Sequence, residues 1–383
     1  MKLISAKLIV IGLSCLILAL PVKAQRINVV TTAVPFLRIS PDARAGAMGD
    51  AGLATSPDVS SIFWNLAKVP FAKTNTSVGL TYTPWLRDLS VNDVFLGTVS
   101  GYHKLDEQQA ISTSLRYFSL GKITFTDING TELFQGNPRE LAFDAGYSRK
   151  LSERIGLGVA LRYIHSNLVG NAPISGQTYK PGTAIAGDIS FYYNGLSEAG
   201  NGWSFGAAAT NLGSKISYTS DAQTKDYIPA NLGIGTAYTK QIDETNRITF
   251  ALDLNKLLVP TPPDTPVTAA IINDYRNKSV ASSWISSLTD GEDFKEITFS
   301  IGAEYTYNEQ FSLRAGYFYE DKTKGNRKYF TLGAGLKYNI FGLNLSYLVP
   351  SGAGVNRNPL SNTLRFSLIF DLDNLGGSSE SGN

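Results

Sequence analysis

The sequence predicts an all-β protein: a barrel of fourteen antiparallel strands that crosses the outer membrane, with an N-terminal segment plugging it. Three observations predict this fold class. The first residues have the pattern of a signal peptide, polar and apolar residues alternate along fourteen segments, and the links between segments are mostly short and long in turn. Transmembrane β-barrels combine these features, because one strand face meets lipid and the links at the two ends differ in length.

Residues 1–24 have the organisation of a cleaved signal peptide. Two lysines precede an apolar run from Leu8 to Leu20, and Ala24 ends a small-residue cleavage pattern. The run is shorter than the ~20 apolar residues that a helix needs to span a bilayer. The only cysteine, Cys15, lies inside the run, so a lipoprotein signal at that position is the alternative interpretation.

The rest of the chain is close to neutral and has no cysteine. The formal charge of +2 counts 34 basic and 32 acidic residues, and three of the basic residues are lysines of the signal peptide. This balance gives no reason to expect nucleic acid as a partner. Without cysteine, neither a disulfide framework nor a thiolate metal site is available. We therefore expect no cofactor.

Alternation with a period of two residues defines the strands. In one segment, Leu157, Val159 and Leu161 share a face, while Gly158 and Ala160 share the opposite face. Each segment is close to the ~9–11 residues that a tilted strand needs to cross the hydrocarbon layer. The predicted strands are approximately 75–85, 92–103, 109–119, 139–150, 155–166, 183–195, 202–212, 229–240, 247–256, 295–307, 311–321, 328–339, 341–349 and 361–372.

The links between strands sort by length. Links after even-numbered strands are short, as at 104–108 and 151–154, whereas most links after odd-numbered strands are longer. Outer-membrane barrels have short periplasmic turns and longer outer loops. A soluble β-sandwich would also alternate, but it would not place its long links at one end. The apolar strand faces are therefore expected to contact outer-membrane lipid.

The opposite strand faces carry charges and are predicted to line the lumen. An Arg or Lys on the lipid side at the midplane would cost about 2–4 kcal/mol. The charged residues assigned to the lumen are Arg116, Asp144, Arg162, Asp188, Asp253, Glu304, Arg314, Lys337 and Arg365.

Two segments lie outside the strand pattern. Residues 25–74 are rich in Ala, Gly and Pro and are predicted to form a hatch inside the barrel of residues 75–372, because such a barrel encloses more space than its side chains fill. Residues 373–383 are expected to be a C-terminal tail.

The longest loop, 257–294, is predicted to contain one helix. Thr265 is its expected N-cap, Pro266 its first residue, and it runs to about Leu288. Its apolar stripe either packs over the rim or forms a partner surface. The expected partner-binding residues in this loop are Ile271, Tyr275, Trp284, Ile285 and Leu288.

No motif for catalysis is present. His103 and His165 each lie at a strand end without metal-ligand spacing, and no nucleophile elbow, phosphate loop or dinucleotide fingerprint occurs. Luminal carboxylates and arginines are the only basis for an enzyme. We expect the protein not to be one.

Residues 40–54, SPDARAGAMGDAGLA, are followed by Asp58 and by Asn65-Leu66-Ala67. This pattern resembles the N-terminal hatch of FadL-like outer-membrane barrels, although Leu66 replaces the usual proline and so argues against a hydrocarbon transporter. The longer run 34–68 resembles the PorV/PorQ family of the type IX secretion system of Bacteroidetes. The residues that carry the hatch motif are Arg44, Ala45, Gly46, Gly49, Ala51, Gly52 and Asn65.

The resemblance implies a function in protein secretion. Such barrels bind the C-terminal domains of secreted cargo, associate with the SprA-type translocon barrel and deliver cargo to the PorU-type attachment complex. We expect these contacts on outer loops 120–138, 167–182, 213–228 and 257–294. FadL-like uptake of hydrophobic small molecules, and a purely structural adaptor, are the competing functions.

Overall fold

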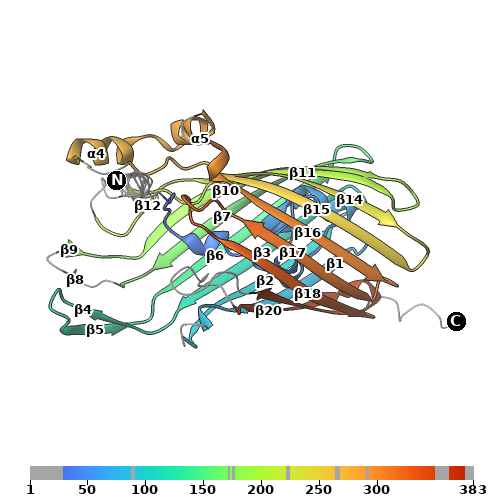
Figure 1. The fold of residues 1–383 in the computed structure, drawn as a ribbon, viewed down its shortest axis with the longest axis horizontal. Helices are drawn as coiled ribbons and strands as arrows, with labels where there is room; N and C mark the ends of the chain where they lie inside the picture. The colour runs from blue at the N-terminus through green and yellow to red at the C-terminus, as the bar shows by residue number, and fades with distance from the viewer. Residues whose placement is uncertain are drawn as a thin grey trace, which may run out of the picture.

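Fourteen strands form a closed antiparallel barrel, in which the last strand, β20, pairs with the first, β1 (Figure 1). The structure is a computed structural model, and it describes residues 29–87, 91–170, 173–174, 177–220, 225–263, 268–289, 293–349 and 362–375. The predicted fold class is thereby confirmed. The signal peptide expected at residues 1–24 lies outside the described residues.

The barrel strands coincide with the fourteen predicted segments to within a few residues. In order around the wall they are β1 (Thr76–Pro84), β2 (Val94–Lys104), β3 (Gln109–Leu120), β6 (Arg139–Lys150), β7 (Ile155–Asn167), β10 (Gly182–Leu196), β11 (Gly202–Gly213), β14 (Asn231–Gln241), β15 (Asn246–Leu257), β16 (Ile297–Tyr307), β17 (Phe311–Tyr319), β18 (Lys328–Tyr338), β19 (Phe341–Val349) and β20 (Leu364–Asp371).

Three two-stranded sheets lie in the loops. They are β4 (Ile123–Thr126) with β5 (Glu132–Gly136), β8 (Pro173–Ile174) with β9 (Gln177–Thr178), and β12 (Ile216–Ser217) with β13 (Lys225–Asp226). All three lie at one end of the barrel, which we call the loop end (Figure 1). The opposite end, where short turns join the strands, is the turn end.

The wall follows the two-residue alternation of the sequence. On β7, Val159 and Leu161 are 53% and 69% exposed on the outside, whereas Ala160 and Ile164 are buried in the lumen. Eight of the nine charged residues assigned to the lumen are buried. Lys337 is the exception, because it lies at the turn end and its half-exposed side chain pairs with Asp371 at 2.6 Å.

One turn illustrates how the turn end is held. The carboxylate of Asp243 accepts hydrogen bonds from the side chain of Asn246 and from the backbone N–H groups of Thr245 and Asn246. These bonds stabilise the charged form and lower the pKa of Asp243 to about 2, with the Asn246 side chain as the largest contributor.

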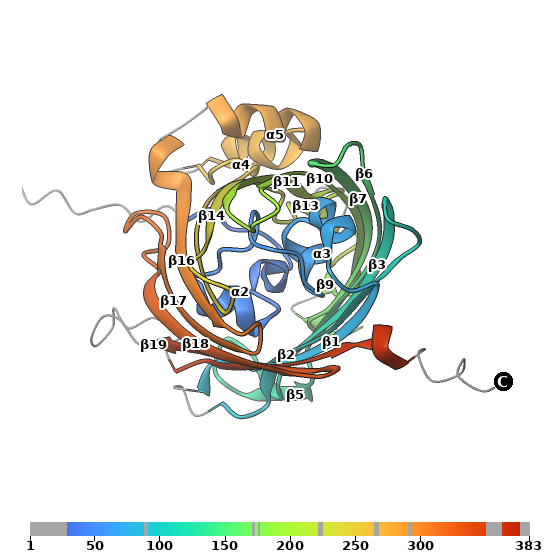
Figure 2. The same ribbon diagram turned by 90° about the vertical axis from the view of Figure 1, so that its right-hand side faces the viewer.

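The described residues before β1 lie mostly inside the barrel (Figure 2). This hatch, described from residue 29 to residue 74, contains η1 (Pro35–Arg38), α2 (Ala43–Ala47), α3 (Ser61–Trp64) and η2 (Leu66–Phe71). The α2 helix packs on β17–β20, while η2 packs on β6, β7 and β10. The hatch therefore joins opposite parts of the wall.

The long outer loop forms two helices, α4 (Ala269–Asn277) and α5 (Val280–Thr289), and then η4 (Asp293–Glu296). The prediction of one helix was wrong. Thr268 is the N-cap of α4, and the predicted start at Thr265 and Pro266 lies outside the described residues. The chain turns away from helical geometry at Lys278, whose carbonyl accepts hydrogen bonds from Lys215 and Tyr227 at 2.8 Å.

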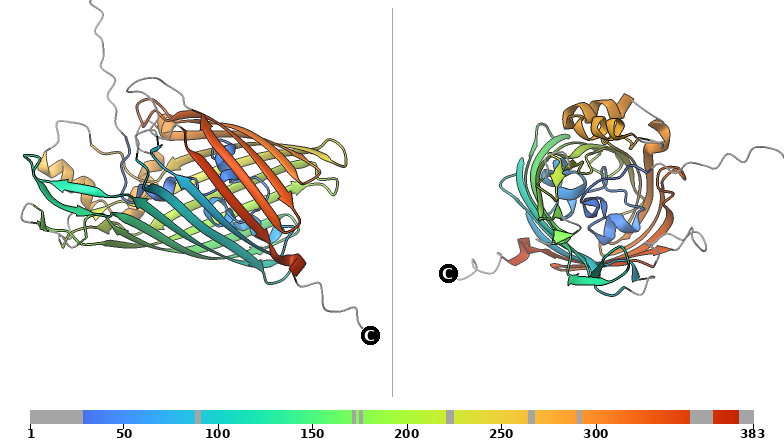
Figure 3. Two further views of the ribbon diagram at one scale, coloured as in Figure 1. Left: turned by 90° about the horizontal axis from the view of Figure 1, so that it is seen from below. Right: turned by 90° about the vertical axis from the view of Figure 1, so that its left-hand side faces the viewer.

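Both helices lie outside the ring of strands when the barrel is viewed along its length (Figure 3). Among the described helices, none is long and apolar enough to cross a membrane.

Residues at and just after the end of β20 stabilise the seam, which is the pairing of β20 with β1 that closes the barrel. The carboxylate of Asp373, in η6 (Leu372–Leu375), accepts hydrogen bonds from the backbone N–H groups of Asn75 at 2.6 Å and Thr76 at 2.8 Å. Asp371 accepts a further hydrogen bond from Ser77 at 2.6 Å. The beginning of the expected tail thus caps the first strand, and residues 376–383 lie outside the described part of the chain.

Replacing Asp373 should loosen this seam. We expect Asp373→Ala to lower the free energy of unfolding by about 1 kcal/mol, since two backbone donors lose a charged acceptor at an exposed site. Urea titration of the purified barrel, followed by loss of its compact electrophoretic form, measures the effect. The matched control is Asp373→Asn, which keeps one acceptor oxygen and should lose less. Equal stability of Asp373→Ala and the parent would contradict a capping role.

Candidate functional site

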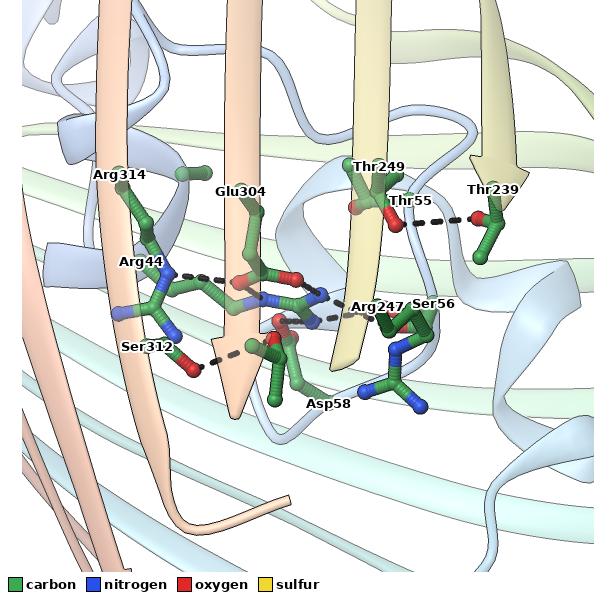
Figure 4. Close-up of polar contacts among 12 residues, drawn as sticks. Arg44, Thr55, Ser56, Asp58, Thr239, Arg247, Thr249, Glu304, Ser312 and Arg314 are labelled. Atoms are coloured by element: carbon green, nitrogen blue, oxygen red, sulfur yellow. Dashed lines mark hydrogen bonds and ion pairs between the residues drawn. The ribbon is translucent and has the colours of Figure 1, made fainter. Parts of the chain in front are cut away.

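Arg44 is the centre of an ion network between the hatch and the wall (Figure 4). Its guanidinium donates two hydrogen bonds to Glu304 on β16, at 2.9 and 2.8 Å, and one to Asp58 at 3.0 Å. Glu304 also accepts a hydrogen bond from Arg314 on β17 at 2.6 Å. Bidentate pairing of this kind fixes orientation as well as distance, so the network sets the position of the hatch in the lumen.

Gly52 is held by a second polar contact with the wall. The carboxylate of Asp253, on β15, accepts hydrogen bonds from the backbone N–H groups of Gly52 at 2.7 Å and Leu53 at 2.8 Å. The Gly52 carbonyl accepts a hydrogen bond from the ammonium group of Lys68 at 2.6 Å, and Lys68 is fully buried. Backbone N–H groups of the hatch therefore donate hydrogen bonds to the wall, and Lys68 forms a hydrogen bond within the hatch.

Gly49 is the position where the hatch backbone approaches the wall closely. Its φ of 68° lies in the left-handed region, and a Cβ there would lie 2.6 Å from the carbonyl oxygen of Tyr317. Its N–H donates to Thr331 on β18 at 2.9 Å. Only glycine meets both requirements without strain.

Asn65 joins the hatch to β10. Its side-chain amide donates to the carbonyl oxygens of Leu53 and Phe191, both at 2.9 Å, and its Oδ1 accepts from the N–H of Ala67. On the neighbouring strand β7, a Cβ at Gly158 would lie 2.8 Å from the Ala67 nitrogen. The closely spaced glycines of β7 thus make room for the hatch.

The remaining motif residues complete the same contact. Asp42 caps α2 by accepting a hydrogen bond from the N–H of Ala45 at 2.8 Å, and Ala51 is fully buried. A Cβ at Gly46 would lie 2.8 Å from the guanidinium of Arg365 on β20. The role of Lys68 in the hatch was not predicted from the sequence, although Lys68 is the only charged residue of the apolar run 66–71.

The hatch does not fill the lumen to its loop end. A cavity of ≈770 Å³ remains there, between the hatch, the wall and the loops. Phe36 and Phe118 line it with rings stacked at 6.2 Å, and Trp85, Leu86 and Arg365 contribute further walls. The hatch predicted inside the barrel therefore leaves space at the loop end.

The five residues expected to bind a partner do not share one face of the outer-loop helices. Tyr275 packs against the rim, with its ring 5.8 Å from that of Tyr227, and Trp284 is half-buried. Ile271, Ile285 and Leu288 are 43%, 69% and 45% exposed. The apolar stripe expected from a single helix is thus divided between the rim and the surface.

Neither histidine has the surroundings of a metal ligand. His103 shares a hydrogen bond of 2.8 Å between its Nδ1 and the hydroxyl of Thr76, and His165 pairs with Leu141 and Thr183 across strands. In the part of the chain that the structure describes, no group of three or more His, Cys, Asp or Glu residues could hold a metal ion.

The closed wall and its internal hatch define the class of protein by its fold, which is that of the FadL-like β-barrels. Three solved structures share the fold: the CymD monoaromatic hydrocarbon channel (TM-score 0.54, 11% identity, 89% of this chain and 99% of that chain), the Ralstonia pickettii toluene transporter TbuX (0.52, 11%, 87% and 98%) and the Pseudomonas putida toluene transporter TodX (0.50, 13%, 90% and 98%). At such low identity they bear on the fold alone.

The sequence identifies the family within this class. The family described as "Type IX secretion system protein PorV" matches residues 22–264, which is more than half of the chain. The chain belongs to the PorV family of the type IX secretion system. No curated protein sequence matches it.

The Arg44 network gives a direct test of how firmly the hatch is held. We expect Arg44→Leu to lower the free energy of unfolding by about 3 kcal/mol, because Asp58 and Glu304 lose a buried partner. Urea titration of the barrel measures this loss. The matched control is Arg247→Leu, which removes an arginine paired at 3.4 Å with the exposed Glu309 and should change stability by less than about 1 kcal/mol. Equal effects of the two substitutions would show that the network does not hold the hatch.

Proposed function

We propose that this barrel is a non-enzymatic carrier of the type IX secretion system. It binds the C-terminal domains of secreted cargo at the loop end, associates with an SprA-type translocon barrel and delivers cargo to a PorU-type attachment complex. Membership of the PorV family supports a role in this system. The contacts with cargo and with the other components are what we propose beyond family membership.

The observation that carries the proposal is the apolar outer surface of α4 and α5. The inner side of this pair is fixed to the rim: Lys215 donates to the carbonyl oxygens of Arg276 and Lys278, and Ser283 donates to the hydroxyl of Tyr227. The outer side exposes Ile271, Ile272, Ile285, Leu288 and, just beyond α5, Phe294, which is 87% exposed. Apolar groups gathered on a fixed, solvent-facing element are typical of protein-binding surfaces.

The position of this pair also favours a protein partner. The helices lie beside the ring of strands at the loop end (Figure 3), so they are accessible to a neighbouring barrel as well as to cargo outside the cell. The loop end is the extracellular end in this proposal, since outer-membrane barrels place their longer loops outside. The described parts of the other expected contact loops, 120–138, 167–182 and 213–228, lie at the same end (Figure 1).

The hydrogen bonds that hold the hatch in the lumen support a carrier that binds its partners on its outer surface. Hatch groups are tied to β10, β15, β16 and β18 through Asn65, Gly52, Arg44 and Gly49. Passage through the lumen would require these contacts to open together. A binding function at the loop end requires none of them to open.

Uptake of hydrophobic small molecules is the second candidate function, and the cavity at the loop end is the observation that favours it. A knockout that secretes normally but fails to take up aromatic or fatty compounds would favour uptake. A purely structural adaptor, which joins the other components without touching cargo, is the third candidate. Crosslinking between the loops and a cargo C-terminal domain distinguishes the adaptor from the carrier.

Removing the helical pair should abolish partner binding. We expect deletion of residues 260–290 to prevent co-purification of cargo and of the translocon barrel from outer membranes, because the rim loses its exposed apolar surface. The deletion leaves the barrel strands intact, and heat-modifiable electrophoretic migration confirms assembly. Unchanged co-purification would remove this loop from the account.

A finer variant separates the exposed side chains from the loop as a whole. The triple substitution Ile271→Ser, Ile285→Ser and Leu288→Ser keeps both helices attached to the rim and should reduce co-purification at least tenfold, as expected when central apolar contacts are lost. The matched control places three changes of the same kind at the turn end, outside every expected contact loop: Leu105→Ser, Leu151→Ser and Ile242→Ser, at residues that are 52%, 61% and 58% exposed. An equal loss of binding in this turn-end variant would show that the effect does not come from the helices.

A further inference from the structure

Two side chains of loop 213–228 fix the helical pair α4–α5 to the rim. The ammonium group of Lys215 donates a hydrogen bond to the carbonyl oxygen of Lys278 at 2.8 Å. The hydroxyl of Tyr227 donates to the same carbonyl at 2.8 Å and accepts a hydrogen bond from Ser283 at 3.1 Å. Lys278 lies between the two helices. The loop therefore holds the pair at the point where α4 ends and α5 begins.

Tyr227 is also the centre of a packed group of side chains. The ammonium nitrogen of Lys215 lies 4.1 Å from the centre of the Tyr227 ring, and the ring of Tyr275 on α4 lies 5.8 Å away in an edge-to-face arrangement. Tyr227 is 5% exposed and shares an apolar cluster with Val30 and Val259. A tyrosine with a packed ring and a hydrogen-bonded hydroxyl is held in one orientation.

The beginning of the hatch reaches Tyr227 from the other side of this contact. We call described residues 29–34 the arm of the hatch. The backbone N–H of Ala33 donates a hydrogen bond to the carbonyl oxygen of Tyr227 at 2.9 Å. Val30 is 9% exposed and lies in the same apolar cluster as Tyr227, whereas its neighbour Val29 is 37% exposed. The arm thus contacts the residue that holds the helical pair.

The arm is held firmly where it enters the lumen. Val34 has a φ of 47°, in the left-handed region, which is unfavourable for a β-branched residue and persists only where the surroundings fix it. Val34 belongs to an apolar core that also contains Ile216 and Ile228. These isoleucines directly follow Lys215 and Tyr227 in the chain. The loop that anchors the helices is therefore itself packed on the hatch.

We propose that the arm of the hatch holds the helical pair in position, with Tyr227 as the positioning residue between them. The contacts lead from Val30 and Ala33 to Tyr227, and from Tyr227 to Lys278. Arg44 fixes the same hatch to β16. The pair is therefore held relative to the whole barrel, and not only relative to a flexible loop.

The consequence for partner binding rests on the proposed function, in which the exposed side of this pair binds cargo and the translocon barrel. A surface that is already held in one orientation loses less conformational freedom when its partner binds. The arm should therefore raise the affinity for partners without contacting them. This separates the arm from the exposed apolar residues, which are proposed to contact the partner directly.

Hydrogen exchange measured by mass spectrometry tests the linkage without any partner. The protein is placed in phosphatidylcholine nanodiscs. We expect Val30→Ser and Tyr227→Phe each to speed exchange of the α4 and α5 amides at least about threefold, because the first weakens a buried apolar cluster and the second removes two hydrogen bonds of the pair. Exchange of the α2 amides and of the barrel strands should stay the same.

Each variant has a matched control. Val29→Ser makes the same change at the exposed neighbour of Val30. Tyr218→Phe removes a hydroxyl from the same loop, but this hydroxyl donates to Ser166 on β7 at 2.9 Å instead of bonding the helices. Both controls should exchange as the parent does. Unchanged exchange of the pair in either Val30→Ser or Tyr227→Phe, or an equal rise in the controls, would overturn the proposal. Should Val30→Ser not assemble, Val30→Ala takes its place, with Val29→Ala as control.

Co-purification of cargo and of the translocon barrel from outer membranes measures the consequence for binding. It should fall at least about threefold in Val30→Ser and Tyr227→Phe, in proportion to the loosening of the pair, and stay unchanged in both controls. Faster exchange with unchanged co-purification would overturn the positioning role.

The triple serine variant of the exposed apolar residues distinguishes this result from a failure of the proposed function. If the triple variant loses its partners while Tyr227→Phe keeps them, the positioning role is wrong and the proposed function stands. If the triple variant keeps its partners, the proposed function is wrong, and the exchange rates alone decide whether the arm holds the helices.

Discussion

The need to pair every backbone polar group inside a hydrocarbon layer determines this structure. No water is available there, so the sheet must close on itself, and closure depends on the pairing of β20 with β1. A closed wall of fourteen strands encloses more space than its own side chains fill. The hatch occupies that space at the turn end, and its polar groups need partners of their own. The charged residues inside the wall meet that need, as Asp253 does for Gly52 and Leu53.

The strands of the wall could be predicted to within a few residues, because consecutive residues of each strand face the outside and the lumen in turn. The outer-loop helix was predicted less well. Its break at Lys278 depends on hydrogen bonds from Lys215 and Tyr227, which lie far away in the chain. Likewise, the C-terminal residues gave no hint that Asp373 caps the first strand, since the pairing spans almost the whole barrel sequence. Local sequence patterns predict local structure, but they do not predict contacts between residues that are far apart in the chain.

The candidate site could likewise be predicted only where local sequence carried the signal. The hatch motif was recognised by resemblance, and its residues do contact the wall. Which wall residues they meet could not be predicted, because Arg44 and Glu304 are separated by 260 positions. Lys68 had no sequence signal beyond being a single charge in an apolar run. The cavity was also unforeseen, since it depends on how far the hatch extends along the lumen.

The contacts of the hatch have a consequence for the order of assembly. They reach strands on opposite sides of the wall, from β10 to β18, and they are enclosed once the seam is fastened. The N-terminal position of the hatch means that it is synthesised before the strands that surround it. It is therefore available for these contacts when the first and last strands pair, so that the barrel can close around it.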